Sequence, residues 1–450
     1  MSKYILFYIL GLAVVFGSCT KETDNLFDQT SDERLSQTLS SFQQALAQAP
    51  GWKVYVYPHG LQSEEIDVGG FTYFMKFTDA NRVSMVSDYD SVMSATPKES
   101  GYRLKAVQRP SIYFDTYSYL HIPADPTFEV STSPTFQQGF GWGTDFDYSF
   151  VKTTPGDTII LKGNFNKSEA VMIKATQVEI DSAFNKGRLK TIRNFTSNYL
   201  DKNKYLYFVA SSNLLSVPSF NLFLRKVVFY NFSASGNLSS IIETPFSYTL
   251  TGLHFKDTVT IGIYAFQDLL WDNVKQLYYF NSGGRRVEFA NETSTIVSFS
   301  LAGMIGGTDY QVISIPPQPL PNQSATFTAK YNAVKANLKS GPYNLDLTYT
   351  QFVFDATNRT MNMNVYAYPG TNLLTAQYNY TYTVDNNGYF KFTRTGQNEY
   401  GRQVEGSMRE ILDYLETDNF RLTGTLTSTI ILGQYTSKER PDFFFSGNLF

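Results

Sequence analysis

Two aspartates have the residue type and the spacing of a catalytic carboxyl pair. Asp145 and Asp147 lie two positions apart in DFDYSFV (145–151), and residues two apart in a strand point to the same face. Glycosidases need two carboxyl groups about 5 to 9 Å apart, and the same pair could bind calcium. A half-exposed sheet also requires alternating polar positions, so a solvated strand face is the simpler interpretation.

A second group of candidates follows one predicted strand, SIYFDTYSYL (111–120). Tyrosines beside an acid can stack on sugar rings and bond their hydroxyls, because the ring has an apolar face and a polar tip. Cross-strand aromatic pairs that stabilise the sheet are the structural alternative. Strand alternation predicts that Tyr113, Asp115, Tyr117, Tyr119 and His121 share one face. Trp142 in the Gly-rich stretch GFGWG could supply a further stacking platform. The candidate ligand-binding residues are Tyr113, Asp115, Tyr117, Tyr119 and Trp142.

Other catalytic chemistry is not favoured by the sequence. The three histidines, His59, His121 and His254, are isolated from one another, and HExxH, GxSxG and GxxxxGKS are absent. We therefore expect no catalytic residue, no metal and no cofactor. The net charge is −3 and no basic stripe is present, so nucleic acid is not expected as a partner.

The composition predicts a sheet protein. Aromatic residues make up 16% of the chain, with 37 Phe and 32 Tyr, and charged residues only 17%, below the roughly 25% of ordinary globular proteins. Aromatic side chains favour half-buried pleated surfaces. We predict an α+β fold that is mainly antiparallel β, with meander, barrel-like or sandwich sheets and a few helices.

Local patterns place the elements. Thr30 and Glu33 have capping-box spacing before a helix that Ala49-Pro50-Gly51 ends, and a second helix is expected from about 177 to 200. After the first helix, the period of the hydrophobic pattern changes to two, and the first predicted strands are 52–57, 71–78, 82–89, 102–107, 111–120 and 145–151.

A segment with four prolines, SIPPQPLPNQS, suggests a division of the chain. After it, a helix and a hairpin at Asp355-Ala-Thr-Asn-Arg359 repeat the order of an earlier helix and the hairpin at Asp79-Ala-Asn-Arg82, so an internal duplication is an open alternative. The predicted regions are a signal peptide at 1–18, a lipidated tether at 19–30, a β-rich domain at 31–313, a linker at 314–324 and a second β-rich domain at 325–450.

The single cysteine indicates where the protein resides. An apolar run from Tyr4 ends in small residues before Cys19 and is shorter than the roughly 20 apolar residues that span a bilayer. FGSC resembles a bacterial lipobox, in which the cysteine becomes a lipidated amino terminus. Two or three acyl chains give lasting attachment, so we expect a lipid-anchored outer-membrane protein, with KETD (21–24) favouring the outward face.

Several motifs together resemble a known family. The lipobox, LFDQTSDERLSQTL leading into APGWKVYVYP, GGFTYFMKF, IYFDTYSYLH, GWGTDFDYSF and TIILKG are similar to a family of uncharacterised Bacteroidetes surface lipoproteins. That family is defined as a domain of unknown function and is often encoded near SusC/SusD-like outer-membrane uptake proteins. The resemblance implies a location and a possible uptake complex as partner, and no catalytic residues.

Three classes of function follow. The first is a non-catalytic binding or accessory component of nutrient uptake, with a glycan or a peptide as ligand. The alternatives are a carboxylate-dependent, glycosidase-like hydrolase and a structural adhesin. Binding without turnover by a purified protein distinguishes the first from the second.

Overall fold

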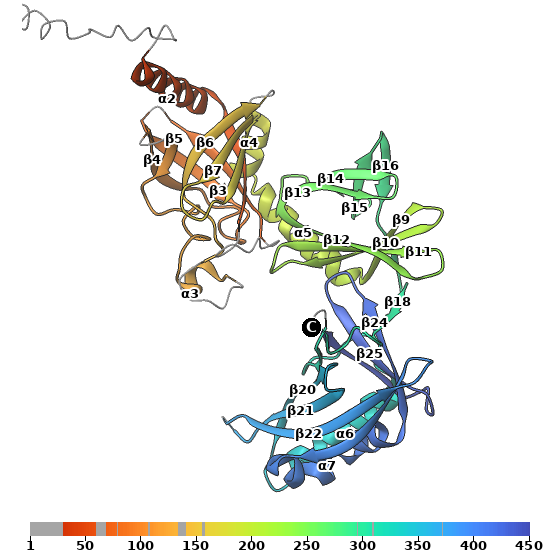
Figure 1. The fold of residues 1–450 in the computed structure, drawn as a ribbon. Helices are drawn as coiled ribbons and strands as arrows, with labels where there is room; N and C mark the ends of the chain where they lie inside the picture. The colour runs from red at the N-terminus through yellow and green to blue at the C-terminus, as the bar shows by residue number, and fades with distance from the viewer. Residues whose placement is uncertain are drawn as a thin grey trace, which may run out of the picture.

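The computed structural model describes residues 30–59, 69–78, 80–106, 109–133, 141–154, 158–294, 296–307, 310–370 and 372–450. Antiparallel strands dominate, and they form three successive units along the chain, from the red first unit to the blue third unit in Figure 1. The predicted α+β fold, mainly antiparallel with a few helices, is confirmed. The expected signal peptide (1–18) and the tether up to residue 29 lie outside the described residues.

The first unit is a closed barrel in which the strands follow one another in chain order and β8 pairs with β1. Large side chains fill its core, among them Tyr73, Met85, Tyr102 and Tyr148. Its strands are β1 Gly51–Tyr57, β2 Phe71–Phe77, β3 Arg82–Ser87, β4 Lys98–Ala106, β5 Pro110–Phe114, β6 Asp147–Thr154, β7 Thr158–Gly163 and β8 Glu169–Ala175.

Helix α2, Ser31–Gln48, packs on this barrel through Phe42 and Leu46, which are both buried. It begins with the predicted capping box: the Thr30 hydroxyl accepts from the Glu33 amide, and the Glu33 carboxylate accepts from the Thr30 amide. A short helix, α3 Phe128–Ser131, lies in the connection from β5 to β6.

The second unit is a nine-stranded sheet with β16 and β17 at its two ends. β16 and β17 follow each other directly, and β16 pairs with β15 while β17 pairs with β9. Stacked and edge-on phenylalanines, including Phe208, Phe229, Phe266 and Phe280, form its core. Its strands are β9 Tyr205–Ser211, β10 Leu214–Asn221, β11 Lys226–Ser233, β12 Leu238–Tyr248, β13 Gly252–Ile261, β14 Tyr264–Asp272, β15 Leu277–Ser282, β16 Arg285–Glu288 and β17 Ala290–Glu292.

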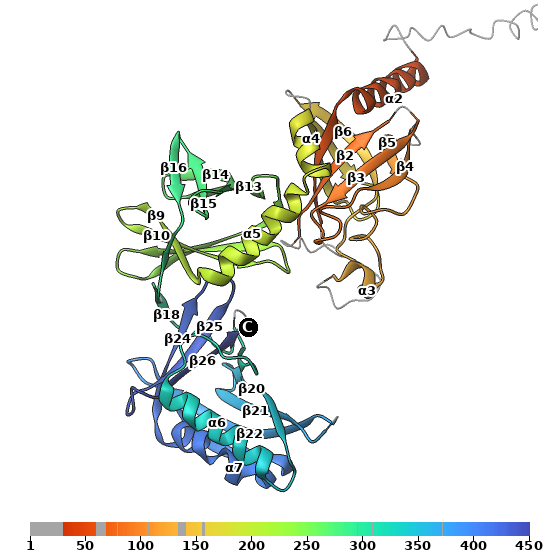
Figure 2. The same cartoon turned by 180° about the vertical axis from the view of Figure 1, so that it is seen from behind.

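Two helices join the first unit to the second. The single helix predicted at 177–200 is in fact α4 Gln177–Phe184 and α5 Arg188–Lys202, because Gly187 between them has a φ of +56°, in the left-handed region. Figure 2 shows α5 running from the barrel towards the second unit. Ile180 and Phe184 of α4 share a buried cluster with Phe74 of the barrel and Leu250 of the second unit.

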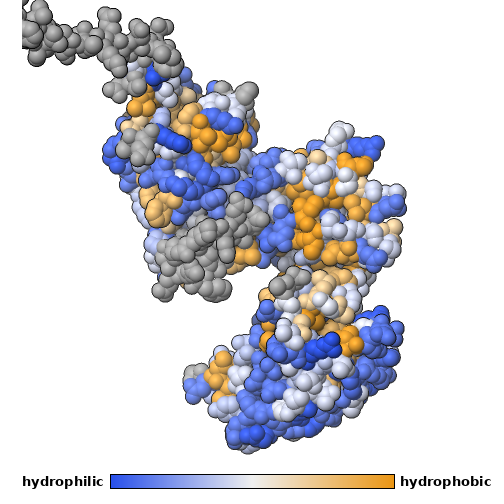
Figure 3. All heavy atoms as spheres, viewed as in Figure 1, coloured by the Kyte–Doolittle hydropathy of each residue, from blue (hydrophilic) through white to orange (hydrophobic). Residues whose placement is uncertain are grey.

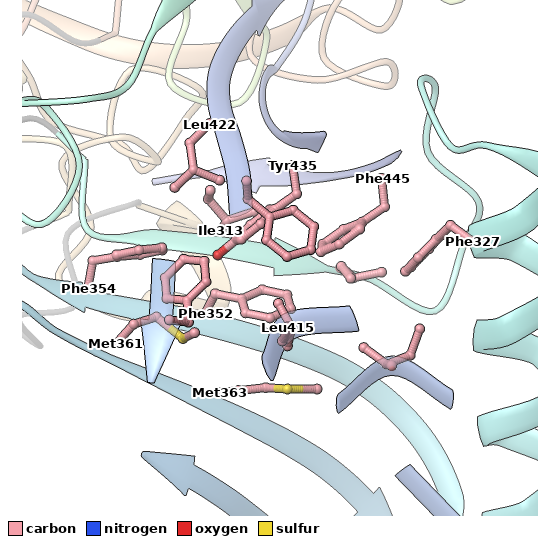
Figure 4. Close-up of a cluster of buried hydrophobic side chains, with 14 of the residues drawn as sticks. Ile313, Phe327, Phe352, Phe354, Met361, Met363, Leu415, Leu422, Tyr435 and Phe445 are labelled. Atoms are coloured by element: carbon pink, nitrogen blue, oxygen red, sulfur yellow. The ribbon is translucent and has the colours of Figure 1, made fainter. Parts of the chain in front are cut away.

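The third unit is again a ring, because β24 pairs with β25 as well as with β23, and β18 is added along β24. Figure 4 shows its core, where the rings of Phe352, Tyr435 and Phe445 pack together. Its elements are β18 Ser298–Ser300, β19 Val312–Ile315, α6 Ala325–Ser340, β20 Asp346–Asp355, β21 Thr360–Tyr368, β22 Leu374–Val384, β23 Tyr389–Gln397, α7 Glu399–Thr417, β24 Asn419–Leu426, β25 Ile431–Ser437 and β26 Phe444–Leu449.

A network of ion pairs links α7 to strand β23. Arg394 contacts both Glu405 and Glu416 at 3.0 Å, and Arg409 contacts Glu416 at the same distance. This helix and α6 lie at the bottom of the molecule in Figures 1 and 2, where Figure 3 shows a mostly hydrophilic surface.

The first and third units repeat one topology. In each, strands in chain order close a ring, and long connections follow the first strand and the fifth strand, so β1 to β8 correspond to β19 to β26. The two hairpins that matched in sequence both join the second strand to the third, and Asn81 and Arg359 both adopt positive φ just before the third strand. The helices do not correspond, because α2 precedes the first strand whereas α6 follows it.

The sheets divide the chain at other places than the proline segment. The expected domain at 31–313 holds two complete units and the first strands of the third, because β18 and β19 belong to the last sheet. The expected linker, 314–324, begins inside β19 and ends at Ser324, whose hydroxyl caps α6 and whose amide donates to Phe444 O at 3.0 Å. Its prolines forbid pairing only between Ile315 and α6.

A buried ion pair fastens the barrel to the second unit. The carboxylate of Asp88, just after β3, lies 2.8 Å from the guanidinium of Arg225, which lies between β10 and β11; their side chains are 0% and 5% exposed. Asp88 also accepts from the amides of Thr72, at 2.9 Å, and Tyr248, at 2.8 Å. Arg225 donates in addition to Gly70 O at 2.6 Å. The pair is therefore hydrogen-bonded on both sides of the junction.

Removing this charge should destabilise the junction. We expect Asp88→Asn to lower the free energy of unfolding by about 3 to 5 kcal/mol, because it leaves Arg225 buried without its counter-charge. The matched control is Asp115→Asn, which breaks a pair with Arg103 of the same 2.8 Å length but with side chains 38% and 51% exposed, so we expect a loss below about 1 kcal/mol. Urea unfolding of both variants measures the difference, and equal losses would contradict the assigned role of Asp88.

The position of β19 predicts which fragment folds. A fragment from residue 296 to 450 keeps β18 and β19 and should show a cooperative thermal transition. A fragment from 324 to 450 lacks β19, which lies between β20 and β26, so two strand edges lose their partners and the fragment should aggregate. Circular dichroism and thermal melting of both fragments provide the measurement, and a cooperative transition in the shorter one would show that β19 is dispensable.

Candidate functional site

The predicted strand at 111–120 ends early, at Phe114, and the chain then leaves the sheet. The turns that follow are closed by their own backbone bonds, from His121 N to Ser118 O at 3.0 Å and from Ala124 N to His121 O at 3.1 Å. The single face predicted for the candidate residues is therefore wrong beyond Phe114. Tyr113 lies on the outer side of β5, and Asp115 just beyond it pairs with Arg103.

Tyr117 and His121 nevertheless meet in a small aromatic stack. The His121 ring stacks on Tyr117 with 5.3 Å between ring centroids and on Phe146 with 4.5 Å. Burial lowers the pKa of His121, which keeps the ring neutral at pH 7. The Tyr117 hydroxyl donates to the carboxylate of Asp125 at 2.5 Å. Tyr117 and Phe146 are exposed, so the stack presents aromatic surface to solvent.

Tyr119 and Trp142 are committed to the interior. Tyr119 is 7% exposed and its hydroxyl donates to Thr96 O at 2.9 Å. Trp142 is 6% exposed, its indole N–H donates to Ser131 O at 2.8 Å, and its ring packs edge-on against Phe71. Neither ring presents a face on which a sugar could stack.

Asp145 is a structural carboxylate. It is buried, and one oxygen accepts from the amides of Phe165 and Asn166 at 2.7 and 2.8 Å. The other oxygen accepts from the amide of Ser168 at 3.0 Å and from its hydroxyl at 2.6 Å. A Cβ on Gly163 would lie 1.9 Å from this carboxylate, which explains the glycine at the end of β7. With both oxygens occupied, Asp145 holds the turn at 164–168 closed.

Asp147 has a different environment from Asp145. It is the first residue of β6, is half-buried and lines a surface cavity. Burial raises its pKa, and the charges of Asp145 and Asp115 raise it further, against the lowering effect of Arg103. The two aspartates therefore do not face a common space as the spacing predicts, because Asp145 precedes the strand and turns inward.

The cavity beside Asp147, which we call the outer groove, has a volume of about 650 Å³ and crosses β5, β6 and β7 on the outside of the barrel. The inward neighbours Ile112, Tyr148 and Leu161 are core residues, so the alternate positions must point outward. The outer groove is lined by Arg109, Ser111, Tyr113, Asp147, Ser149, Lys162, Gly163, Asn164 and Lys167.

A chain of polar side chains links the strands of the outer groove. The hydroxyls of Ser111 and Ser149, which are paired across β5 and β6, lie 3.0 Å apart. The Ser149 hydroxyl donates to the side-chain oxygen of Asn164 at 2.5 Å. Tyr113 and Asp147 form the next cross-strand pair. Hydroxyl, amide and aromatic groups thus lie side by side, as in sites that orient a polar ligand.

A second cavity, of about 600 Å³, lies between α2 and the barrel. It is lined partly by Phe42, Trp52 and Phe150, and the rings of Phe42 and Phe150 are 5.9 Å apart. The other lining side chains include Gln37, Gln48 and Lys174. It contains none of the candidate residues named from the sequence.

Metal ligands and membrane helices are not found in the part of the chain that the structure describes. Within those residues, no group of three or more His, Cys, Asp or Glu side chains is placed to hold an ion. None of the described helices is long and apolar enough to cross a bilayer.

Comparison with known proteins identifies a family. The model of a domain of unknown function, DUF4302, matches residues 23–273, which is more than half of the chain. The chain belongs to the DUF4302 family. No curated protein matches the sequence.

Solved structures aligned with this DUF4302 protein are remote. The DNA polymerase III β subunit of Thermotoga maritima has 8% identity and a TM-score of 0.16, over 92% of this chain and 96% of that one. The β clamp of Helicobacter pylori has 9% identity and a TM-score of 0.15, over 93% and 97%. A tail fibre of Staphylococcus aureus phage P68 has 7% identity and a TM-score of 0.12, over 87% and 93%. TM-scores this low give no basis for assigning a shared fold or function.

Sequence reasoning found part of the outer groove in this DUF4302 protein. Tyr113 and Asp147 were candidates, whereas Arg109, Lys162 and Lys167 were not. The available signal was period-two alternation in TIILKG, where Ile159 and Leu161 face the core and Lys162 must face outward. Only the pairing of β5, β6 and β7 brings these residues to one surface.

We predict that neutralising Asp145 and neutralising Asp147 affect the free energy of unfolding differently. Asp145→Asn should lower the free energy of unfolding by about 1 to 3 kcal/mol, because an amide N–H₂ would face donors that now bond a carboxylate. Asp147→Asn should leave stability at pH 7 unchanged or slightly higher, because a raised pKa means that the fold disfavours the ionised form. The difference in stability between Asp147→Asn and the natural protein should vanish as pH falls through the raised pKa of Asp147. Urea unfolding at pH 7 and pH 4 measures both, and a larger loss for Asp147→Asn would reverse the assignment.

Proposed function

We propose that this DUF4302 protein is a lipid-anchored, non-catalytic binding or accessory component of nutrient uptake at the outer membrane, with a glycan or peptide as ligand. The observation that carries the proposal is the outer groove, whose volume of about 650 Å³ falls within the range of small-ligand sites. Its lining combines Tyr113 with hydroxyl, amide and charged groups. The lipobox-like FGSC stretch supports the anchor, and KETD after it supports the outward-facing location.

The hydrolase alternative finds less support in the geometry. A glycosidase of this kind needs one carboxyl group free to donate a proton and a second one opposite it. Asp145 accepts four hydrogen bonds in a buried turn, so it has no free oxygen for a substrate. Among the described residues that line the outer groove, Asp147 is the one carboxylate, and the other charged side chains, Arg109, Lys162 and Lys167, are cationic.

The anchor is tested through Cys19. We expect Cys19→Ala to abolish labelling by palmitate in the native cell and to release the protein from the outer-membrane fraction, because the thiol is the proposed site of lipid attachment. Ser18→Ala is the matched control, since it keeps a small residue before the cysteine and should be labelled like the natural protein. Persistent labelling of Cys19→Ala would refute the lipid anchor.

The binding function is tested with protein that begins at Thr20. Glycan and peptide arrays identify ligands, and each ligand found is then incubated with the protein and analysed for cleavage products. Binding without product supports the proposed function, product release supports the hydrolase, and the absence of any ligand supports a structural adhesin. Pull-down of SusC/SusD-like proteins from outer membranes tests the proposed partner.

A further inference from the structure

Positive charge gathers on the outside of the barrel around the outer groove. Arg109, Lys162 and Lys167 line it. On the neighbouring strand β4, Arg103 pairs with Tyr113 and Lys105 with Ser111, and directly opposed residues point to the same side of a sheet. Both are exposed. Among the residues that the structure describes, the carboxylates that line the outer groove or pair with these cations are Asp115, Asp147 and Glu169. Five cations therefore face three carboxylates in a chain whose net charge is −3.

The two lysines of the outer groove are held weakly enough to take a ligand. Lys162 lies 3.4 Å from Glu169, and their side chains are 36% and 51% exposed; such surface pairs contribute little and exchange readily. The ammonium of Lys167 donates to the carbonyl of Asn164 at 2.6 Å, so this bond does not neutralise its charge. An anion that enters here would meet charged donors at the cost of weak contacts only.

The remaining lining suits a carbohydrate. The Ser111, Ser149 and Asn164 side chains supply a row of hydroxyl and amide groups across three adjacent segments. Tyr113 adds a ring that can contact the apolar face of a sugar and a hydroxyl that can bond to it. Side chains with both donors and acceptors match a ligand that carries many hydroxyls.

We propose that the outer groove binds an acidic oligosaccharide, one whose sugars carry carboxylate or sulfate groups. Arg109, Lys162 and Lys167 pair with the anionic groups, while Tyr113, Ser111 and Ser149 contact the sugar ring and its hydroxyls. The cationic surface disfavours basic peptides by like-charge repulsion. This inference rests on the proposed binding function and names the class of ligand.

The test uses protein that begins at Thr20, with oligogalacturonides, sulfated chondroitin oligosaccharides and neutral maltooligosaccharides as probes, and with oligoglutamate as an acidic peptide. We expect binding of at least one acidic oligosaccharide that weakens as salt rises. Arg109→Gln combined with Lys162→Gln should lower that affinity at least about tenfold, because each substitution removes a charged hydrogen-bond donor. The matched control is Lys186→Gln combined with Lys190→Gln, which removes the same charge from exposed positions at α5 and just before it and should bind normally. Thermal melting verifies that both variants are folded.

The outcomes separate the inference from the function on which it rests. Preference for galacturonate or for sulfate decides which anionic group the site takes, and either one supports the inference. Binding of neutral sugars alone, equal binding of oligoglutamate, or an equal loss in both double variants would overturn the acidic-oligosaccharide site while leaving a binding protein. No binding to any glycan or peptide would overturn the proposed function itself.

Discussion

The buried contact between Asp88 and Arg225 is the constraint that makes the barrel and the second unit one body. Two charges leave water here, which costs several kcal/mol per ion unless both are fully hydrogen-bonded. The backbone supplies those bonds from both units: the carboxylate oxygens of Asp88 accept from the amides of Thr72 and Tyr248, and the guanidinium of Arg225 donates to the carbonyls of Gly70 and Asp88. The guanidinium also lies 4.6 Å from the centre of the Phe71 ring. An ion pair with this many directional partners fits one arrangement of the two units, because a shift of either would break several bonds at once.

A simpler contact joins the second unit to the third. Ser428, between β24 and β25, receives the amide of Phe220 on its carbonyl and donates its own amide to Lys204 O, both at 2.7 Å. Val217 and Tyr230 of the second unit belong to the same buried cluster as Phe352 of the third. Apolar burial with two backbone bonds restricts the angle less than a hydrogen-bonded ion pair does, since the hydrophobic effect is not directional. The two junctions are therefore built on different physics, and the charged one adjoins the unit that carries the outer groove.

A feature was predictable from the sequence when it depends on interactions between residues that are close together in the chain. The fold class, the start of α2 at Thr30 and the hairpin after β2 rest on composition, capping and turns within a few residues, and each was predictable. The prediction that the strand continues through Asp115 was wrong for a local reason. Polar and aromatic residues alternate in this turn as they do in a strand, so alternation does not distinguish the two. The domain division failed because β19 is separated from its partner β26 by more than a hundred residues of chain. Arg109 and Lys162 meet through the register of three strands, which a single sequence does not encode in any local pattern.

Closure of the first barrel also explains why the candidate site lies on its outer surface. A ring of eight strands is only wide enough for its own side chains or one small ligand, and here Tyr73, Tyr102 and Tyr148 fill the interior. Paired edges leave no strand for a peptide to join. Concave surface must then come from irregularities outside, and β6 provides one, because its register against β7 shifts between Phe150 and Lys152. A bulge increases the local twist of a strand. Before that shift, Ser149 stands opposite Lys162 in the outer groove, and beyond it Thr153 stands opposite Ile159 and lines the second cavity. One strand thus lines both cavities of the barrel.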